Sequence, residues 1–349
     1  MASTQLIGWF ADVGLADRPT VGGKGASLGE LTRAGIPVPE GFVVRTAGFD
    51  RFIEELERTA PVRAAVEQVD ASDLAAVEKL SAQLRERVEA CALPQDLRDE
   101  LRAAHTALCE GSARAPLAVR SSATTEDAED ASFAGLQDTY LWVLGIEEIE
   151  HQLRSCWASL YSVPSITYRR AKALPEAGVS MAVVVQRMVD ARSAGVMFTR
   201  SPTSGDRSVI VIEGAWGLGS AVVSGEVTPD RFVIGKIAGE ISVRELRDKH
   251  VMHVPLPEGG TREVQTPEAK RNEPCVSDEE LAGLREVGRR IERHYGKPQD
   301  IEWAIDQQHR IRILQSRPET VWSSREPAPV TTVQADPLLH VMNIFGGKR

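Results

Sequence analysis

Two short segments near residue 300 constrain the fold more than any other feature of the sequence. The segments "DIEWAID" at 300–306 and "RIRILQSRP" at 310–318 each alternate apolar and polar residues. A period of two is typical of a β-strand that buries one face. A short turn centred on Gln308 and His309 would join the two segments. The chain is therefore predicted to form an antiparallel hairpin here.

This hairpin would bring polar side chains together on one face. Its register puts Glu302 opposite Gln315 and Asp300 opposite Arg317. A carboxylate and an amide oxygen side by side suit a hard cation such as Mg²⁺, and the neighbouring arginine suits a phosphate. The alternative is a plain cross-strand salt bridge on a wet surface. The hairpin alone leaves both interpretations open.

Helices and strands are mixed along the rest of the chain. Residues 27–34 and 278–295 are predicted to be helices, and 61–110 to be a helical pair or bundle broken at Pro94. Strands are expected in "GFVV", in "SMAVVVQRMVD" and on both sides of "EGAWGLGSAVVSGE". Because these elements do not alternate strictly, the fold class is predicted to be α+β.

The stretch "VGGKGASLGEL" at 21–31 places Lys24 among glycines before a helix. It matches neither a Walker A loop, which needs glycine where Arg18 stands, nor a Rossmann fingerprint, which needs glycine at Leu28. One interpretation is a flexible turn with a solvated lysine. The other is a turn that lets Lys24 bind an anion at the start of a helix.

A second basic residue, Arg120, follows a short apolar strand at 117–119. Its planar guanidinium matches phosphate oxygens. Hydroxyl side chains that could assist follow at Ser121, Ser122, Thr124 and Thr125. The acidic residues in 126–130 are interpreted as a solvated loop. The glycines of "EGAWGLG" are explained either by a phosphate loop or by close backbone packing.

Composition narrows the class of protein. A length of 349 residues suggests about two domains, and a net charge of −9 argues against a nucleic-acid partner. The four cysteines form no CxxC pair, as in a protein with reduced thiols. No segment resembles a signal peptide, and none approaches the ~18 apolar residues of a membrane span. A cytoplasmic protein without membrane contact is expected.

Six ordered motifs resemble those of one family. They are "GGKGASLGEL", "GIPVPEGFVV", "VRSSATTEDAEDASFAGLQDTYL", "VVVQRMVDARSAGVMFT", "EGAWGLGSAVVSGEVTPD" and "DIEWAI…ILQSRPET", spanning about residues 8–320. Together they resemble the N-terminal nucleotide-binding part of phosphoenolpyruvate synthase, pyruvate phosphate dikinase and rifampin phosphotransferase. The resemblance implies an ATP-grasp fold, with two lobes that close over a nucleotide cleft holding ATP and Mg²⁺. It divides the chain into an N-terminal lobe at 1–184, a C-terminal lobe at 185–320 and a linker-like tail at 321–349.

The resemblance also implies roles for single residues. Lys24 and Arg120 would contact the ATP phosphates, and Arg317 the transferring phosphates. Glu302 and Gln315 would hold Mg²⁺. The inter-lobe hinge, with Gln186, Met188 and Val189, would hydrogen-bond adenine. Glu213 and Thr139 would lie near the nucleotide.

The chain departs from the family in one respect. Full-length members carry a phosphorylated histidine in a Thr-x-His-Ala context, and none of the seven histidines here has that context. A stand-alone ATP-binding subunit is therefore expected, similar to that of phenylphosphate or cresol-phosphorylating synthases. Its partner subunit would carry the histidine and pass the phosphoryl group to a phenolic hydroxyl, with AMP and phosphate as products. The alternatives are part of a phosphoenolpyruvate synthase or rifampin phosphotransferase, and a non-catalytic ATP-sensing module.

Overall fold

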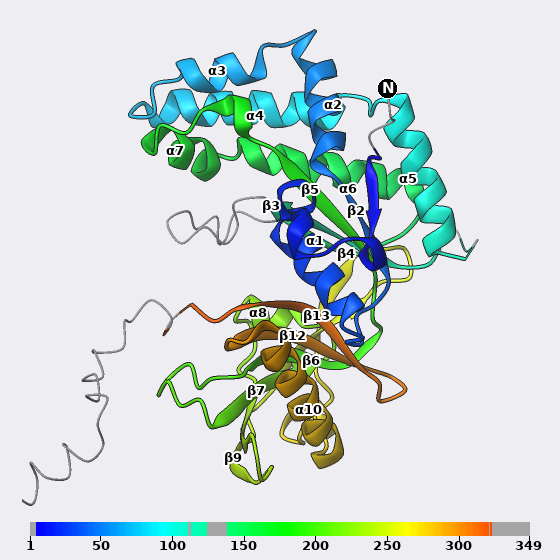
Figure 1. Ribbon diagram of the computed structural model, residues 1–349, viewed down its shortest axis with the longest axis vertical. Coiled ribbons are helices and arrows are strands. Elements are labelled where there is room, and N and C mark those ends of the chain that lie inside the picture. Colours follow the sequence, from blue (N-terminus) through cyan, green and yellow to red (C-terminus); the bar gives the residue numbers. More distant parts are fainter. Residues whose placement is uncertain (1–4, 111, 113, 124–137, 321, 323–349) are drawn as a thin grey trace, which may run out of the picture.

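A computed structural model describes residues 5–110, 112, 114–123, 138–320 and 322 of the chain. Two antiparallel sheets, each with its own hydrophobic core, form separate upper and lower parts of the molecule (Figure 1). Every strand pairing within these sheets is antiparallel. The predicted α+β class is confirmed.

The first sheet is flanked by helices on both faces. Its strands, in spatial order, are β1 (Ile7–Trp9), β2 (Gly41–Val44), β5 (Met181–Arg187), β3 (Leu117–Ala123) and β4 (Thr139–Val143). The larger helical layer consists of α2 (Thr46–Glu57), α3 (Val62–Gln68), α4 (Leu74–Ala90), α5 (Gln95–Leu108), α6 (Ile146–Ala158) and α7 (Val163–Ala171). In its core, Trp157 packs against Phe49 and Phe52.

Helix α1 (Arg18–Arg33) covers the other face of this sheet and joins the two parts of the molecule. Val21 and Leu28 pack with Val184 of the first sheet. Leu31, near the end of the helix, belongs to the core of the second sheet. The Ser27 hydroxyl also donates to the carbonyl of Ser316 on the second sheet at 2.6 Å. The helix thus fixes the position of one sheet relative to the other.

The second sheet has the order β13 (Ile311–Pro318), β12 (Gln299–Asp306), β6 (Ala191–Phe198), β7 (Val209–Trp216), β8 (Asp230–Gly235) and β9 (Ile241–Glu245). Helix α10 (Asp278–Tyr295) packs on one face, where Ile301 and Trp303 lie in the core. Other elements of this part are α8 (Ser220–Val223), the hairpin of β10 (Val251–Pro255) and β11 (Thr261–Gln265), and α9 (Glu268–Arg271). Short 3₁₀ helices occupy Phe10–Asp12, Leu15–Asp17, Ser159–Tyr161 and Glu176–Gly178.

Several boundaries differ from the prediction. The helix expected at 27–34 begins at Arg18 and is kinked at Gly22, whose φ of 70° is not helical. The strand expected at 117–119 continues to Ala123, because β5 pairs with it along its whole length. Arg120, Ser121 and Ser122 therefore lie within a strand and not in a polar loop. Thr124, Thr125 and the acidic run that follows are outside the described residues.

The predicted hairpin is present, with one irregularity. Asp300 pairs with Arg317 and Glu302 with Gln315, as the alternation predicts. A β-bulge between Glu302 and Trp303 then shifts the remaining pairs by one residue. The helix predicted at 278–295 has these same bounds.

The division expected between residues 184 and 185 falls inside β5, whose last three residues still pair with β2 and β3. Residues 321–349, expected as a tail, lie outside the described residues except Trp322.

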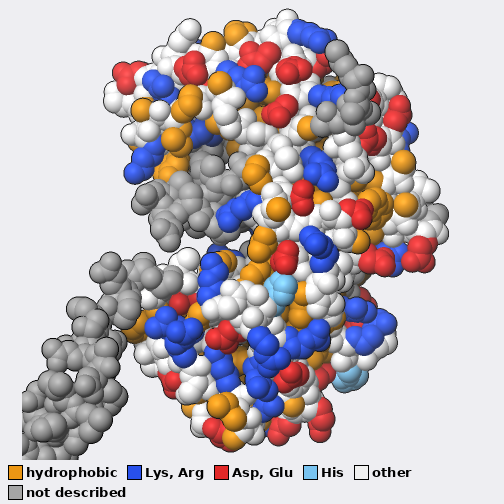
Figure 2. All heavy atoms as spheres, in the orientation of Figure 1, with side chains coloured by type: hydrophobic (Ala, Val, Ile, Leu, Met, Phe, Trp, Pro, Cys, Tyr) orange, Lys and Arg blue, Asp and Glu red, His pale blue; other side chains and the backbone are white. Residues whose placement is uncertain are grey.

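Cys91, Cys109, Cys156 and Cys275 are free thiols. Among the described residues, no helix combines the length and the apolar character that a membrane crossing requires. Lys and Arg side chains gather on the lower half of the face shown in Figure 2, interspersed with Asp and Glu.

Candidate functional site

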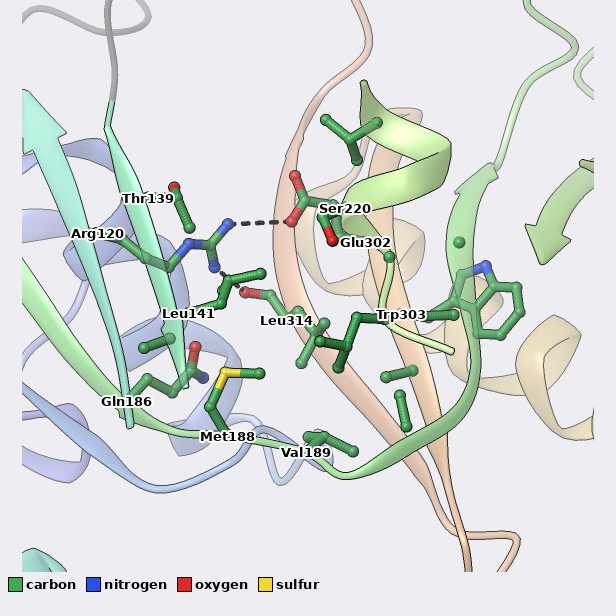
Figure 3. Close-up of a pocket in the computed structure, with 18 of the residues that line it drawn as sticks. Arg120, Thr139, Leu141, Gln186, Met188, Val189, Ser220, Glu302, Trp303 and Leu314 are labelled. Carbon is green, nitrogen blue, oxygen red and sulfur yellow. Dashed lines mark hydrogen bonds and ion pairs between the residues drawn. The ribbon is translucent and has the colours of Figure 1, made fainter. Parts of the chain in front are cut away.

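Arg120 connects the two sheets. It stands on β3 of the first sheet, and its guanidinium reaches the β12–β13 hairpin of the second (Figure 3). Nη2 donates to Oε1 of Gln315 at 2.7 Å and to Oε2 of Glu302 at 3.0 Å, and Nη1 donates to the carbonyl of Leu314 at 2.9 Å. Only 8% of Arg120 is exposed. A buried guanidinium is therefore held by three oxygen atoms, two of which were predicted to bind a metal ion.

The β-bulge supplies the third of these oxygens. Glu302 pairs with Gln315 and Trp303 with Ile313, which leaves Leu314 without a direct partner on β12. An unpaired residue at a bulge has backbone groups that are available to other partners. The Leu314 carbonyl accepts from Arg120, and the Ile313 amide donates to the Pro37 carbonyl at 2.9 Å. The bulge thus leaves a backbone carbonyl of the hairpin available to Arg120 of the first sheet.

A cavity of about 320 Å³ opens beside Arg120, where the two sheets meet. Most of its wall is apolar, and its residues come from both sheets and from the connection between β5 and β6 (Figure 3). The apolar lining includes Ala118, Leu141, Met188, Val189, Ala194, Leu218, Ala304 and Leu314. Arg120, Thr139 and Glu302 form the polar end. Such a cavity fits a ligand with an apolar body and a charged end.

The residues expected to form the hinge line this cavity. Gln186, at the end of β5, is buried, and its side-chain amide donates to the Pro39 carbonyl at 3.2 Å. Met188 and Val189 follow in the connection to β6, and the Met188 amide donates to the Pro116 carbonyl at 3.0 Å. The exposed Thr139 pairs with Arg120 across β3 and β4. Six of the ten expected site residues therefore line this one cavity: Arg120, Thr139, Gln186, Met188, Val189 and Glu302.

Lys24 lies in the first turn of α1 after the kink at Gly22, and only 7% of it is exposed. The interpretation as a solvated lysine is therefore wrong. Ser122 shapes this turn, since its hydroxyl donates to the Val21 carbonyl at 2.9 Å and accepts from the Gly25 amide at 3.1 Å. A Cβ at Gly22 would lie 2.1 Å from the Ser122 carbonyl oxygen, so this close approach requires glycine. Lys24 is held beside β3, but it is not among the residues that line the cavity.

Arg317 forms a cross-strand pair with Asp300, with Nε 2.8 Å from Oδ2. The Arg317 side chain is 58% exposed, and Asp300 is the more buried partner. Burial raises the pKa of Asp300, and the charge of Arg317 opposes this rise. The cross-strand salt bridge, which the sequence offered as one of two interpretations, is thus present between Arg317 and Asp300. It lies next to the Arg120 cluster on the same face of the hairpin.

Glu213 lies on the same face of the second sheet as Glu302, because both residues pair with Val196 of β6. Two strand spacings separate them, which is about 10 Å. The Glu213 carboxylate is 3.7 Å from Nε of Arg231. Burial raises the pKa of Glu213, and the charge of Arg231 opposes this rise. The neighbouring residue Gly214 packs against the ring of Trp303. A Cβ added at Gly214 would lie 2.8 Å from this ring. The "EGAW" half of the glycine stretch is therefore explained by close packing.

These features define an α+β protein with a ligand cavity between two antiparallel sheets, apolar along its walls and charged at one end. Residues 18–336 match the family model described as the AMP/ATP-binding domain of pyruvate phosphate dikinase, and the chain belongs to this family.

The relatives are longer proteins. A probable phosphoenolpyruvate synthase of Methanothermobacter thermautotrophicus is 43% identical over 318 residues, covering 90% of this chain and 46% of that protein. A rifampicin phosphotransferase of a Streptomyces species is 44% identical over 320 residues, covering 91% of this chain and 36% of that protein. The chain thus spans less than half the length of these relatives. Among solved structures, a D-cycloserine synthetase aligns with 83% of this chain, and the alignment covers 60% of the synthetase chain. The identity is 13% and the TM-score is 0.28.

Sequence reasoning missed the apolar wall of the cavity. Leu141, Leu218 and Leu314 come from three distant segments, and no local pattern marks them as neighbours. One signal was available for Leu141, which stands two residues after Thr139 on the same short strand and shares its face. The role of the Leu314 carbonyl had no signal, because it depends on the bulge.

Proposed function

We propose that this chain has an ATP-grasp fold and binds ATP with Mg²⁺ in the cavity between its two sheets. From there it would transfer a phosphoryl group to a histidine on a partner subunit. One observation carries the proposal: Arg120 from one sheet meets Glu302 and Gln315 from the other at the charged end of an apolar cavity. Membership in an AMP/ATP-binding family supports the choice of ligand.

The cavity accounts for both ends of the nucleotide. The adenine ring would lie against Met188, Val189 and Leu141, where the lining is apolar. The phosphates would extend toward Arg120 and Lys24, whose charges offset theirs. Positioning and charge neutralisation are the main contributions of a protein to phosphoryl transfer. The buried guanidinium is suited to this because it is shielded from water.

Glu302 and Gln315 fit a divalent cation. Their side-chain oxygens already converge on one positively charged group, the guanidinium of Arg120. A carboxylate and an amide oxygen are ligands of the kind that Mg²⁺ takes. When bound, Mg²⁺ would neutralise charge on the phosphates. Arg120 would then leave these oxygens for the phosphates, and Arg317 would exchange Asp300 for the transferring group.

The proposed reaction has two steps. In the first, a histidine nitrogen of the partner subunit attacks the β-phosphorus of ATP, and AMP leaves. Water then cleaves the γ-phosphoryl group from the pyrophosphoryl group on the histidine, which releases phosphate and leaves the β-phosphoryl group on the histidine. In the second, the phosphohistidine passes its phosphoryl group to a small-molecule hydroxyl. We propose a phenol or cresol as this acceptor, and this choice rests on the proposal that the histidine belongs to a separate subunit. The names of two relatives point instead to the synthesis of phosphoenolpyruvate and to rifampicin. We place the reaction in the cytoplasm, where ATP is supplied.

The first step can be tested with the purified chain, ATP, Mg²⁺ and the protein encoded by the neighbouring reading frame. AMP and an acid-labile phosphohistidine on the partner are expected. Phenol, p-cresol, pyruvate and a rifamycin, each added separately, then identify the acceptor by loss of the partner's label. If the chain binds ATP and its partner affinity depends on the nucleotide, but neither AMP nor labelled partner forms, the chain is an ATP-sensing module and the relay is excluded.

A further inference from the structure

We propose a second cation site, for a divalent transition-metal ion of the Zn²⁺ type, formed by Glu226, His253 and Glu263. These residues come from the loop after α8, from β10 and from β11. None of them lines the cavity beside Arg120. The site is therefore separate from the proposed Mg²⁺ site and does not depend on the proposed function.

The backbone brings these three ligands together. His253 and Glu263 are direct cross-strand partners on β10 and β11, so their side chains share one face. Glu226 approaches from the other side, with Oε2 2.7 Å from Nε2 of His253. One ligand atom from each residue lies within 4.8 Å of the other two. One imidazole with two carboxylates is a donor set that suits Zn²⁺ and similar ions.

His253 is oriented as a metal ligand requires. Its Nδ1 is 2.7 Å from the Ser220 hydroxyl, and its backbone carbonyl accepts from the Leu218 amide at 3.0 Å. When Nδ1–H donates to Ser220, the lone pair of Nε2 faces the carboxylates. A hydrogen bond from the second ring nitrogen to an oxygen is the usual way a metal-binding histidine is held in place.

The local charge also favours a cation. In the part of the chain that the structure describes, the Glu263 carboxylate has neither a hydrogen bond nor an ion pair. Two carboxylates beside one imidazole repel each other, and a divalent ion would offset this repulsion.

A bound ion would have a structural consequence. It would attach the β10–β11 hairpin to the segment around α8, from which Ser220 and Ser224 line the cavity. The site would thereby stabilise one wall of the cavity without contacting its ligand.

The full chain, freed of metal with a chelator, should be titrated with Zn²⁺ in the presence of excess Mg²⁺, by equilibrium dialysis and by thermal unfolding. One bound equivalent is expected, with a rise in Tm. Glu263→Gln and His253→Asn should each weaken Zn²⁺ binding at least about tenfold and remove the rise in Tm. Glu263 is exposed, so this variant is expected to fold normally.

A matched control is available on the same chain. Nε2 of His294 lies 2.8 Å from Oε1 of Glu30, a surface pair that lacks a third ligand in the described residues. His294→Gln should leave Zn²⁺ binding unchanged. Equal binding by the wild type and Glu263→Gln would overturn the proposal, as would a loss in His294→Gln as large as that in His253→Asn.

Discussion

Nη2 of Arg120 and Oε1 of Gln315 are joined by a buried hydrogen bond of 2.7 Å between residues 195 positions apart in the sequence. The bond crosses from the first sheet to the second, and the Leu314 carbonyl beside it accepts a further bond from the same guanidinium. Arg120 therefore has two properties at once. It holds the two parts of the molecule together, and it occupies the oxygens proposed to bind Mg²⁺.

Replacing Arg120 tests whether its guanidinium competes with a metal ion for these oxygens. In Arg120→Met, Glu302 and Gln315 lose their cationic partner, so the nucleotide-free protein should bind Mn²⁺, used as a probe for Mg²⁺, more tightly than the wild type does. ATP should bind about 10- to 150-fold more weakly, because hydrogen bonds to a charged group contribute about 1.5–3 kcal/mol. Calorimetric titrations with Mn²⁺ and with ATP measure both effects. The exposed Arg207 provides the control variant Arg207→Met, which should change neither. Weaker Mn²⁺ binding in Arg120→Met would show that the arginine does not compete with the ion.

Glu302→Ala should impair Mg²⁺-dependent phosphoryl transfer far more than folding. The Glu302 side chain is 31% exposed and faces the cavity, so its loss leaves the apolar core intact. AMP formation should fall at least about 100-fold, as when one group that stabilises charge is removed from an active site, while Tm changes little. Glu213→Gln, two strands away on the same face, should lower the rate much less. Normal turnover by Glu302→Ala would remove Glu302 from the metal site.

Gly22→Ala should destabilise the protein by about 1–3 kcal/mol, because it forces a side chain into a left-handed backbone conformation. At this position φ is +70°, and the new Cβ would meet the backbone of Ser122. Chemical denaturation measures the change, and ATP affinity should fall with it as Lys24 moves. Gly178 has no positive φ, and no atom of the described residues lies within 4 Å of its added Cβ, so Gly178→Ala is the matched control. Equal stability of the two variants would contradict the strained turn.

Stability should decrease on acidification because of Glu280, the third residue of α10, which forms the capping box of that helix with Ser277. Burial raises the pKa of Glu280, but hydrogen bonds with Ser277, His309 and Arg192 outweigh it, and the net pKa lies below the ordinary value of 4.5. A carboxyl with a lowered folded-state pKa stabilises the protein fully above pH 4.5, and this contribution is lost as the pH falls through the folded-state value.

The variant Glu280→Gln tests this relation. It should lower the free energy of unfolding at pH 7 by about 1–3 kcal/mol and flatten its dependence on pH below the ordinary pKa. Urea denaturation at several pH values gives both quantities. Glu286→Gln removes an exposed carboxylate from the same helix and should keep the wild-type slope. A slope that Glu280→Gln leaves unchanged would assign the acid sensitivity to other groups.

Local patterns predicted several elements with correct bounds. Alternation and the position of a turn placed Glu302 opposite Gln315, because a one-residue error would turn the apolar side chains to the wrong face. Helix α10 begins at the capping box of Ser277 and Glu280 and ends before Gly296 in a left-handed conformation. These signals lie within a few residues of the features they specify.

The amino-acid sequence by itself determined the hairpin, the helices and the pairs of polar residues that neighbouring strands bring together, since periodicity and capping act over short distances along the chain. Only the tertiary structure decided that Arg120 reaches Gln315, that a bulge frees the Leu314 carbonyl, and which leucines line the cavity. The physical reason is packing: helix α1 contributes residues to the cores of both sheets, and this arrangement, which no local pattern encodes, sets the distance between them.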